Sequence, residues 1–388
     1  MAIDLQGEFM MPSVDGCKPI VRAARPSDNA ALLALARSAP MRGHLEVCAD
    51  RSPDFFAFSQ LQGESSIVWI AEHSPQTTSD SRLIGCTTEV QRHERIGGEA
   101  TLRMHVGDMR VDPNIRRSAI GTVLAGQLRH RFAASDCTSG SFEVIGGNEA
   151  ALRGRKAFEP EMKVFLEDRL NLWQIPLWRN YRAGPWLCRQ ATWADLPQLE
   201  DLLNASYKHH RGHPDFSPIA LQNHLNSHPS FSINDIWLAE KNKRVLACLG
   251  LWVQEGLRTT IVQRLTPQGR AVLAGLSLAK PILKLADLPQ KGSPLRFGFL
   301  RYLAHAEGML QPLQSLVRYV ATEYHHQRQL QFFALALATN DPLNASLKGL
   351  WKLSLPIHLF QFTRPGPESS RLEKQWRHLI PYTDLALV

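Results

Sequence analysis

Residues 111–126, VDPNIRRSAIGTVLAG, are the stretch from which the fold of this 388-residue chain can be worked out. An apolar run with alternating polarity, Ala100 to Val111, precedes it and predicts a β-strand. After it, apolar residues recur at helical spacing: Ile120, Val123, Leu124, Leu128 and Phe132. The sequence therefore predicts a strand, a short turn and a helix in direct succession.

The turn between this strand and helix is small and positively charged, Arg116-Arg117-Ser118-Ala119-Ile120-Gly121. The first turn of a helix has free backbone N–H groups and the positive end of the helix dipole, so it suits a phosphate group. The small residues Ser118, Ala119 and Gly121 would let a phosphate approach the backbone closely. On spacing alone, a plain strand–turn–helix connection with a solvated arginine pair is an equal alternative.

The motif Val111-x-Pro113-x-x-Arg116-x-x-Ala119-x-Gly121 resembles the acyl-coenzyme A signature of the GNAT superfamily of N-acetyltransferases, Gln/Arg-x-x-Gly-x-Gly/Ala. Ala119 stands where the family usually has Gly. The resemblance implies that acetyl-coenzyme A is a cosubstrate, that the loop amides hold its pyrophosphate, and that the end of the strand lends backbone groups to its pantetheine. The cofactor-binding residues implied in this way are Met109, Arg110, Val111, Arg116, Arg117, Ser118, Ala119, Ile120, Gly121 and Thr122.

A second motif, Asn148-x-x-Ala151, resembles the later Asn-x-x-Ala motif of the same superfamily. In the family its helix packs near the thiol end of the cofactor, so the resemblance adds Asn148 to the cofactor-binding residues. The helix lacks the tyrosine that often reprotonates the departing thiolate in the family. Lys156, Arg155 or a water molecule would have to supply that proton.

The second part of the chain repeats the first. Residues 186–196 echo residues 20–28, since both combine a short strand with an Arg, a small residue, an Asp and a Leu-rich helix. We interpret this as an internal duplication of two GNAT-like domains, 18–173 and 186–366, with a C-terminal tail, 367–388. The fold class expected is α+β, with a mixed, mainly antiparallel central sheet flanked by helices in each domain.

Each domain is expected to close with its own last strand, Met162 to Leu170 in the first and Ile357 to Phe362 in the second. Residues 171–185 between the domains are expected to be a connector. The second copy is expected to be degenerate for the cofactor, because its loop, 305–312, lacks the motif and carries Glu307. A carboxylate there would repel a phosphate.

The base that removes a proton from the attacking amine is sought near the end of the strand at Val111. Asp108 is the nearest acidic residue and the predicted catalytic residue, with His105 three positions earlier. By strand alternation the two should face opposite sides of the sheet. A salt-bridged residue in a bulge beside Gly107 is the alternative interpretation of Asp108. Glu89 and Glu143, on adjoining strands, are secondary candidates.

Composition limits the class of protein. With 44% hydrophobic and 21% charged residues the chain is typical of a soluble globular protein, and no apolar run of about 18 residues predicts a membrane span. The N-terminus lacks the pattern of a secretory signal, and the six cysteines are scattered. We therefore expect a cytoplasmic protein with reduced thiols and no membrane partner.

The net charge of +8 would suit a polyanionic partner, and the phosphates of coenzyme A would account for part of it. No basic stripe alternates with aromatic residues, so no nucleic-acid partner is expected. The tract 209–213, HHRGH, is interpreted as a solvated polar loop rather than a metal site, because no Cys or carboxylate lies at ligand spacing before Asp215.

Three functions are compatible with these observations. The leading hypothesis is an N-acetyltransferase that transfers an acetyl group from acetyl-coenzyme A to a primary amine of a small molecule or peptide, with a homodimer as the oligomeric form to test. A non-catalytic acyl-coenzyme A sensor or partner-binding protein is the alternative, motivated by the missing tyrosine, Ala119 and the degenerate second copy. Transfer of a longer acyl chain is the third. The sequence does not identify the acceptor.

Overall fold

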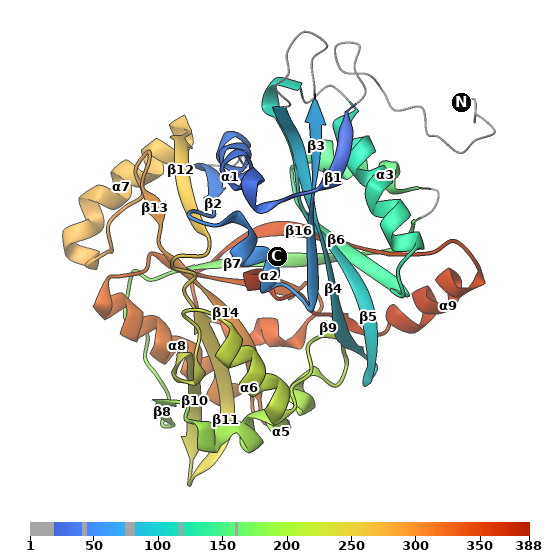
Figure 1. The fold of residues 1–388 in the computed structure, drawn as a ribbon. Coiled ribbons are helices and arrows are strands. Elements are labelled where there is room, and N and C mark those ends of the chain that lie inside the picture. Colours follow the sequence, from blue (N-terminus) through green and yellow to red (C-terminus); the bar gives the residue numbers. More distant parts are fainter. Residues whose placement is uncertain (1–18, 41–44, 74–81, 116–118, 160–161) are drawn as a thin grey trace.

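The computed structural model describes residues 19–40, 45–73, 82–115, 119–159 and 162–388. In this part of the chain fourteen strands form one sheet that crosses the molecule, and helices cover both of its faces (Figure 1). This confirms the α+β class. The strands of the first half are β1 (Ile20–Ala23), β3 (Ser65–His73), β4 (Arg82–Ile96), β5 (Glu99–Val111), β6 (Ser139–Ile145) and β7 (Lys163–Pro176). Those of the second half are β8 (Leu187–Gln190), β10 (Ile236–Lys241), β11 (Arg244–Trp252), β14 (Phe297–His305), β15 (Phe332–Ala338) and β16 (Leu353–Thr363).

Smaller elements complete the fold. Two short strands, β9 (His210–His213) and β17 (Ile380–Pro381), pair at the side of the large sheet, and β2 (Leu45–Asp50), β12 (Thr259–Leu265) and β13 (Pro294–Leu295) form a separate sheet. The helices are α1 (Asn29–Ser38), α2 (Phe55–Gln60), α3 (Ile120–Ala133), α4 (Glu149–Gly154), α5 (Leu196–Tyr207), α6 (Pro218–Ser227), α7 (Pro267–Leu283), α8 (Leu310–Gln327) and α9 (Pro367–Trp376).

The order of strands in the large sheet reads alike from both edges. It runs β1-β3-β4-β5-β6-β16-β7-β15-β14-β11-β10-β8. In each half the parallel pair, β5 with β6 and β14 with β15, is flanked by antiparallel neighbours. The two halves therefore have the same strand order, and equivalent strands are related by an approximate two-fold symmetry.

Side chains repeat as well as strands. Near the edge of each half an arginine on the first strand binds two carboxylates: Arg22 binds Asp28 at 2.8 Å and Glu72 at 2.5 Å. In the second half Arg189 binds Asp195 at 2.7 Å and Glu240 at 2.8 Å. Both aspartates also close a capping box before the helix that follows. This repetition supports the duplication inferred from the sequence.

The two halves exchange their last strands. β16, from the end of the chain, lies between β6 and β7, and β7 lies between β16 and β15 of the second half. The expectation that each unit closes with its own last strand is therefore wrong. Residues 171–176, expected as part of a connector, continue β7 and pair with β15. The residues there, NLWQIP, have no strict alternation of polarity, so the sequence alone revealed neither the strand nor its partner.

The exchange is held by aromatic packing. Phe360 and Phe362 of β16 are fully buried in the core of the first half. The ring centroids of Phe142 and Phe360 are 5.0 Å apart, and those of Phe132 and Phe362 are 5.1 Å apart. The division of the chain into 18–173, 186–366 and a tail stays a prediction. Wherever the boundaries between the domains lie, the two halves share the central strands β7 and β16.

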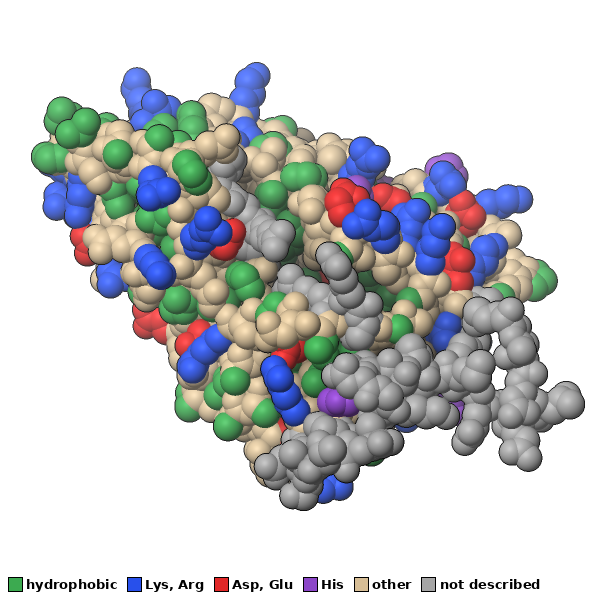
Figure 2. All heavy atoms as spheres, turned by 90° about the horizontal axis from the view of Figure 1, so that it is seen from above, with side chains coloured by type: hydrophobic (Ala, Val, Ile, Leu, Met, Phe, Trp, Pro, Cys, Tyr) green, Lys and Arg blue, Asp and Glu red, His purple; other side chains and the backbone are tan. Residues whose placement is uncertain are grey.

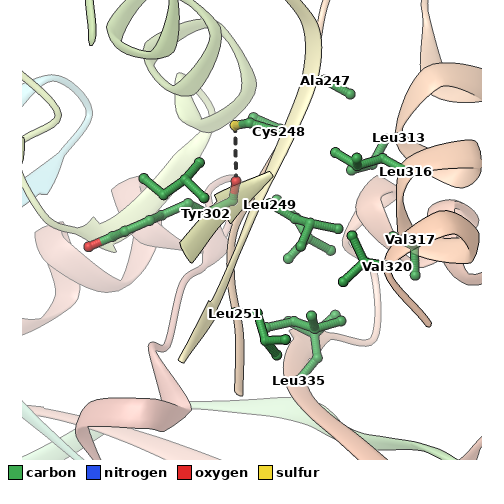
Figure 3. Close-up of a cluster of buried hydrophobic side chains, with 14 of the residues drawn as sticks. Ala247, Cys248, Leu249, Leu251, Tyr302, Leu313, Leu316, Val317, Val320 and Leu335 are labelled. Atoms are coloured by element: carbon green, nitrogen blue, oxygen red, sulfur yellow. Dashed lines mark hydrogen bonds between the residues drawn. The ribbon is translucent and has the colours of Figure 1, made fainter. Parts of the chain in front are cut away.

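Helices cover the two faces of each half. In the first half α3 packs on one face through Ile120, Leu124 and Leu128. Helices α1 and α2 pack on the opposite face. In the second half α8 packs on β11 and β14, with Leu313, Leu316 and Val320 against Leu249 (Figure 3). None of the helices in the described ranges is long and apolar enough to cross a membrane.

The histidine tract is a buried strand rather than the solvated loop expected. His210, Arg211 and His213 are at most 7% exposed in β9, which pairs with β17 and with β4. Arg211 forms an ion pair with Asp168 and donates to the carbonyl of Trp376 at 2.9 Å. The polar residues are buried because the strand and the segment after α9 satisfy each other's hydrogen bonds, which spacing alone could not predict.

The exchange predicts the behaviour of a cleaved chain. A protease site inserted between the exposed Arg179 and Asn180 would, once cut, leave two fragments that elute together from a size-exclusion column under native conditions. They should stay together because each fragment supplies a strand to the interior of the other's sheet. Separation into two folded fragments would contradict the exchange, and uncut protein with the same insertion is the control.

Candidate functional site

The site predicted from the sequence lies where β5 and β6 separate. The two strands pair only from Arg103 to His105, opposite Ser139 to Ser141, and are not paired beyond that point. Backbone groups past the separation lose their strand partners on that side, so something else must satisfy them. Strands that diverge in this way leave room for an extended ligand between them.

A β-bulge follows the separation. Asp108 has a left-handed backbone with a φ of 51°, and the pairing of β4 with β5 shifts register between Cys86 and Thr88. The second half repeats it: Tyr302 has a φ of 52°, and the register of β11 with β14 shifts between Cys248 and Gly250. Non-glycine residues seldom adopt this conformation. Its recurrence at the equivalent position supports the duplication.

A cysteine accompanies each bulge. The Cys86 Sγ lies 3.7 Å from the carbonyl oxygen of Asp108, and the Cys248 Sγ lies 3.3 Å from that of Tyr302 (Figure 3). Each thiol is positioned to donate to the carbonyl of the bulged residue. Both cysteines are fully buried, so they support the bulge from inside the core.

The bulge reverses the alternation of side chains along β5. Before it, Met104 and Val106 face α3, and after it Val111 does so. His105 therefore lies on the face opposite α3, and so do Asp108 and Arg110, which contact residues on the side of α1 and α2. The expectation that His105 and Asp108 face opposite sides is wrong, because one extra residue changes the period of two.

Asp108 is held by two arginines. Its carboxylate forms an ion pair with Arg51 and another with Arg110, at 3.1 Å. Burial alone would raise the pKa of the Asp108 carboxyl, but the two positive charges outweigh burial and hold it well below its ordinary value. Both alternatives weighed for this residue, the bulge and the salt bridge, are observed. The predicted role of Asp108 in catalysis stays a prediction.

His105 and Glu143 form a second polar pair at the separation. The His105 Nδ1 lies 3.6 Å from the Glu143 Oε2, and the side chains are only 1% and 7% exposed. Neither atom, nor the His105 Nε2, has a hydrogen-bond partner among the described residues. Buried polar atoms are rarely left without partners in folded proteins, so such a pair at the point where strands part marks a candidate site.

Burial sets the protonation of this pair. It lowers the pKa of His105 to about 3 and raises the pKa of Glu143 to about 7. The imidazole is therefore neutral near neutral pH, while the carboxyl can take up and release a proton there. A carboxyl tuned to the working pH is what proton transfer requires. The neighbouring candidate Glu89 is already engaged, since it accepts from Trp69 at 2.9 Å and pairs with Arg131.

The start of α3 is open in the described part of the chain. Its N-cap is Ala119, without a side-chain capping bond, and its first turn carries no acidic residue. A Cβ built on Gly121 would meet no described atom within 4 Å, and Thr122 is exposed. Ile120 is fully buried beside Ala71 and Leu124 and anchors the helix. The predicted phosphate ligands Arg116, Arg117 and Ser118 lie outside the described residues.

The remaining predicted cofactor residues lie on both sides of this opening. Met109 is 40% exposed directly after the bulge, Arg110 is engaged with Asp108, and Val111 ends the strand opposite Gly85. Asn148 is exposed at the start of α4, where its side chain accepts from the Ala151 N–H at 3.2 Å. The structure thus brings the strand end and the start of α3 together at one edge, with Asn148 on a neighbouring loop.

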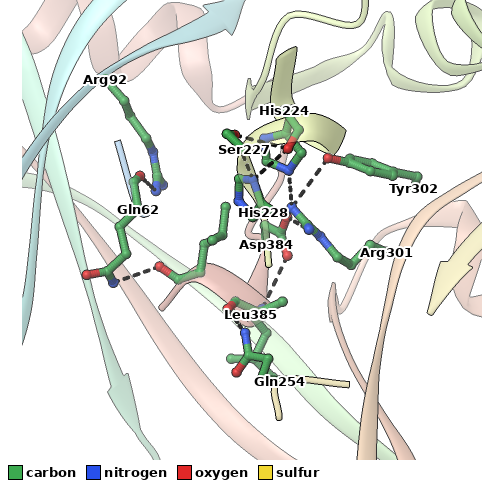
Figure 4. Close-up of polar contacts among 12 residues, drawn as sticks. Gln62, Arg92, His224, Ser227, His228, Gln254, Arg301, Tyr302, Asp384 and Leu385 are labelled. Atoms are coloured by element: carbon green, nitrogen blue, oxygen red, sulfur yellow. Dashed lines mark hydrogen bonds and ion pairs between the residues drawn. The ribbon is translucent and has the colours of Figure 1, made fainter. Parts of the chain in front are cut away.

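In the second half the equivalent opening is filled. The tail after β17 lies against β14 and β15, where Asp384 binds Arg301 at 2.6 Å (Figure 4). The remaining cavity, lined by Tyr302, Leu337 and Tyr382 among others, is about 20 Å³, room for roughly one water molecule. Glu307, which was expected to repel phosphate, is exposed and lies 3.3 Å from Lys208.

The tail also reaches the first half. Gln62 donates to the Leu387 carbonyl at 2.8 Å, and Thr383 contacts the carboxyl of Glu143. The C-terminal segment therefore lies between the two openings, near the centre of the molecule (Figures 1 and 4). Sequence reasoning missed this segment, and it missed Arg51, because neither carries a local pattern that indicates its distant partners.

Comparison with known proteins identifies the fold. No protein-family model and no curated protein matches the sequence. Among solved structures, Saccharomyces cerevisiae N-myristoyltransferase with bound myristoyl-CoA is 11% identical, with a TM-score of 0.57 over 90% of this chain and 85% of that chain. A GCN5-related N-acetyltransferase from Sphaerobacter thermophilus is 12% identical, with a TM-score of 0.51 over 90% and 96%.

A third similar structure belongs to a larger protein. It is the GCN5-related glucosamine N-acetyltransferase region of a fungal multi-domain GH3 β-N-acetylglucosaminidase, 12% identical, with a TM-score of 0.56 over 89% of this chain and 38% of that one. At these identities the likeness shows the fold. The chain has the GNAT fold, as the resemblance in its sequence implied, and the likeness extends over nearly its whole length.

The ion pairs of Asp108 generate a stability prediction. Asp108→Asn should lower the free energy of unfolding by about 3 to 5 kcal/mol at neutral pH, because Arg51 keeps a buried charge without its carboxylate. Since folding lowers the pKa of Asp108, its stabilisation is present above the ordinary value of 3.8 and is lost as the pH falls below it. The difference between variant and wild type should therefore shrink in acid.

Urea unfolding at several pH values measures this difference. The control is Glu307→Gln, which neutralises a carboxylate whose side chain is 86% exposed and should change stability little. Equal stability of Asp108→Asn and wild type at neutral pH would show that the ion pairs do not support the bulge.

Proposed function

We propose that the protein is an N-acyltransferase that moves the acetyl group of acetyl-coenzyme A to a primary amine. The observation that carries the proposal is the diverging pair β5 and β6, which leads from the bulge at Asp108 to the open start of α3. This geometry offers unpaired strand groups to a pantetheine arm and helix N–H groups to a pyrophosphate. The GNAT fold and the sequence motif support the same assignment.

The phosphate end of the cosubstrate would lie at the start of α3. The groups proposed to hold it are the amides from Arg116 to Thr122, with Gly121 leaving the backbone accessible. The Asp112 carboxylate, the nearest described acid in the loop, is neutralised by Arg82 and by the Asn114 N–H at 2.9 Å. It therefore offers little repulsion to a phosphate.

The transfer itself needs three groups. A neutral amine attacks the thioester carbonyl, a new C–N bond forms, and the C–S bond breaks to release coenzyme A as a thiolate. Backbone N–H groups near Met109 and Arg110, next to the bulge, would stabilise the oxyanion that develops on the carbonyl. The proton lost by the amine goes to a protein base, and the thiolate takes a proton from water or from Lys156 or Arg155.

Two carboxylates are candidates for the base. Asp108 is the predicted one, but an ionised carboxylate stabilised by two arginines accepts a proton poorly. Glu143, with a pKa of about 7 and an unpartnered Oε2, is better suited, and the neutral His105 beside it can orient the amine or a water. We favour Glu143, and comparison of Glu143→Gln with Asp108→Asn distinguishes the two candidates.

The acyl chain and the acceptor belong to the same proposal. The similar structures include one with bound myristoyl-CoA and one described as a glucosamine N-acetyltransferase, so both long and short chains are used on this fold. Competition between acetyl- and myristoyl-coenzyme A for binding would decide the chain length. A small-molecule or peptide amine is the proposed acceptor class.

The free cysteines of the described chain support the expected cytoplasmic location.

The first test is of binding. Gly121→Glu places a carboxylate where the pyrophosphate is proposed to lie, and it should weaken acetyl-coenzyme A binding by at least about tenfold in calorimetry. The space around Gly121 is open, so the fold should tolerate the side chain. Gln127→Glu, which adds the same charge on α3 about 9 Å further along, is the matched control.

Two results of this titration would contradict the binding assignment: no binding by the wild type, or equal weakening by Gln127→Glu. Binding by the wild type without release of free thiol on any amine of a broad panel would instead favour the acyl-coenzyme A sensor.

The second test is of the base. Glu143→Gln should lower kcat by roughly 10²- to 10⁴-fold and leave cosubstrate binding unchanged, because the amide cannot accept a proton. The kcat/KM of the wild type should rise with pH through about 7, as Glu143 loses its proton. Glu143→Asp should retain part of the activity. Full activity in Glu143→Gln, with loss in Asp108→Asn, would assign the base to Asp108.

Glu143→Gln should lower turnover but raise the free energy of unfolding above pH 7. Folding raises the pKa of Glu143, so its contribution to stability is complete below the ordinary value of 4.5 and is lost as the pH rises through about 7. Above pH 7 Glu143→Gln should be more stable than the wild type, by on the order of 3 kcal/mol. A gain in stability together with a loss of turnover is not expected of a residue with a merely structural role.

A further inference from the structure

Helix α7 lies at the edge of the molecule and exposes apolar side chains. Val272 is 63% exposed, Leu278 83% and Ile282 83%, and Gly269 is the only buried residue of this helix. The helix belongs to the insert between β12 and β13 and projects beside the small sheet (Figure 1). In a folded protein, exposed aliphatic residues that gather on one helix indicate a surface that meets something else.

The exposed residues share one face. Ala271, Gly275, Leu278 and Ile282 follow one another at helical spacing, so they form a continuous stripe along the outside of α7. Seen from above in Figure 2, hydrophobic side chains gather at the end of the molecule where α7 lies, with lysines and arginines around them. The protein side of the helix rests on β12 through few contacts.

The charged residues of α7 and its C-cap are all positive, and Asp287 is the one carboxylate in residues 257–293. From Leu257 to Ala286 the chain carries five arginines and lysines and no aspartate or glutamate. Arg270 and Lys284 are exposed at the two ends of α7, and Lys280 lies between them with one exposed partner, Asp287, at 2.8 Å. A helix with one apolar face and cations on its remaining surface is complementary to a surface that is anionic outside and apolar beneath.

We propose that α7 docks the protein onto an anionic lipid surface, lying in the plane of the interface with Leu278 and Ile282 inserted. Two copies of α7 that face each other would bring Arg270, Lys280 and Lys284 of each copy together, with only Asp287 to offset them, and this net positive charge opposes self-association through this face. The stripe also lacks the aromatic residues that anchor most protein interfaces. This peripheral contact differs from a membrane span, and it revises the expectation of no membrane partner.

Vesicle co-sedimentation of the full-length protein tests the proposal. The protein should bind phosphatidylcholine vesicles that contain phosphatidylglycerol, bind pure phosphatidylcholine vesicles weakly, and be released by high salt. The double variant Leu278→Asp/Ile282→Asp and the charge reversal Arg270→Glu/Lys284→Glu should each weaken binding by at least roughly tenfold. Ile219→Asp, a 73% exposed apolar residue on α6, is the matched control and should bind as the wild type does.

A spectroscopic readout places the contact on α7. In Leu278→Trp, the fluorescence of the new indole should shift to shorter wavelength when anionic vesicles are added, and no such shift should occur with pure phosphatidylcholine. Each of the following results would overturn the proposal: no binding to anionic vesicles, binding unchanged by both double variants, or a wild-type dimer in light scattering that Leu278→Asp/Ile282→Asp converts to monomer. Coenzyme A binding should be unaffected by these variants, so failure here leaves the proposed function standing.

Discussion

The separation of two parallel strands determines what each half of this protein can hold. Where β5 leaves β6, and where β14 leaves β15, backbone groups lose their partners, and buried backbone groups must find others. In the second half the C-terminal segment lies against the separated strands, where Asp384 pairs with Arg301. In the first half the equivalent position is Gly107, which has no side chain to receive such a segment. The ion pair that anchors the segment in the second half therefore has no counterpart in the first.

The buried charged side chains around the first opening form two clusters. Asp108, Arg51 and Arg110 neutralise one another at the bulge, and Arg51 also stacks on Phe58 at 4.6 Å. This cluster fixes the backbone and has little capacity to exchange protons. Glu143 and His105 lie nearby, and on Glu143 burial outweighs the charges of Arg92 and Arg103 and the contact with Thr383, so the pKa of its carboxyl rises to about 7. The first cluster supports the bulge, and the second contains the carboxyl that we propose as the base.

Local sequence patterns predicted most of the fold and part of the site. Helical spacing predicted α3 nearly to the residue, and the motif from Val111 to Gly121 led to the GNAT fold. The bulge at Asp108 was weighed but its effect on alternation was not foreseen, because one added residue changes the face of everything after it. The exchange of β7 with β16 and the burial of the tail depend on contacts between distant segments, such as Gln62 with Leu387, which no window of sequence contains.

The strand order that reads alike from both edges has one more consequence. It is the connectivity of two identical chains that form a domain-swapped dimer, each lending its last strand to the other, with the two polypeptides then fused end to end. In a symmetric dimer of that kind both openings must serve the same purpose. Fusion removes this constraint, since each copy can then mutate alone. The two openings can then differ, and here the C-terminal segment fills the second one. A symmetric homodimer does not allow such a difference.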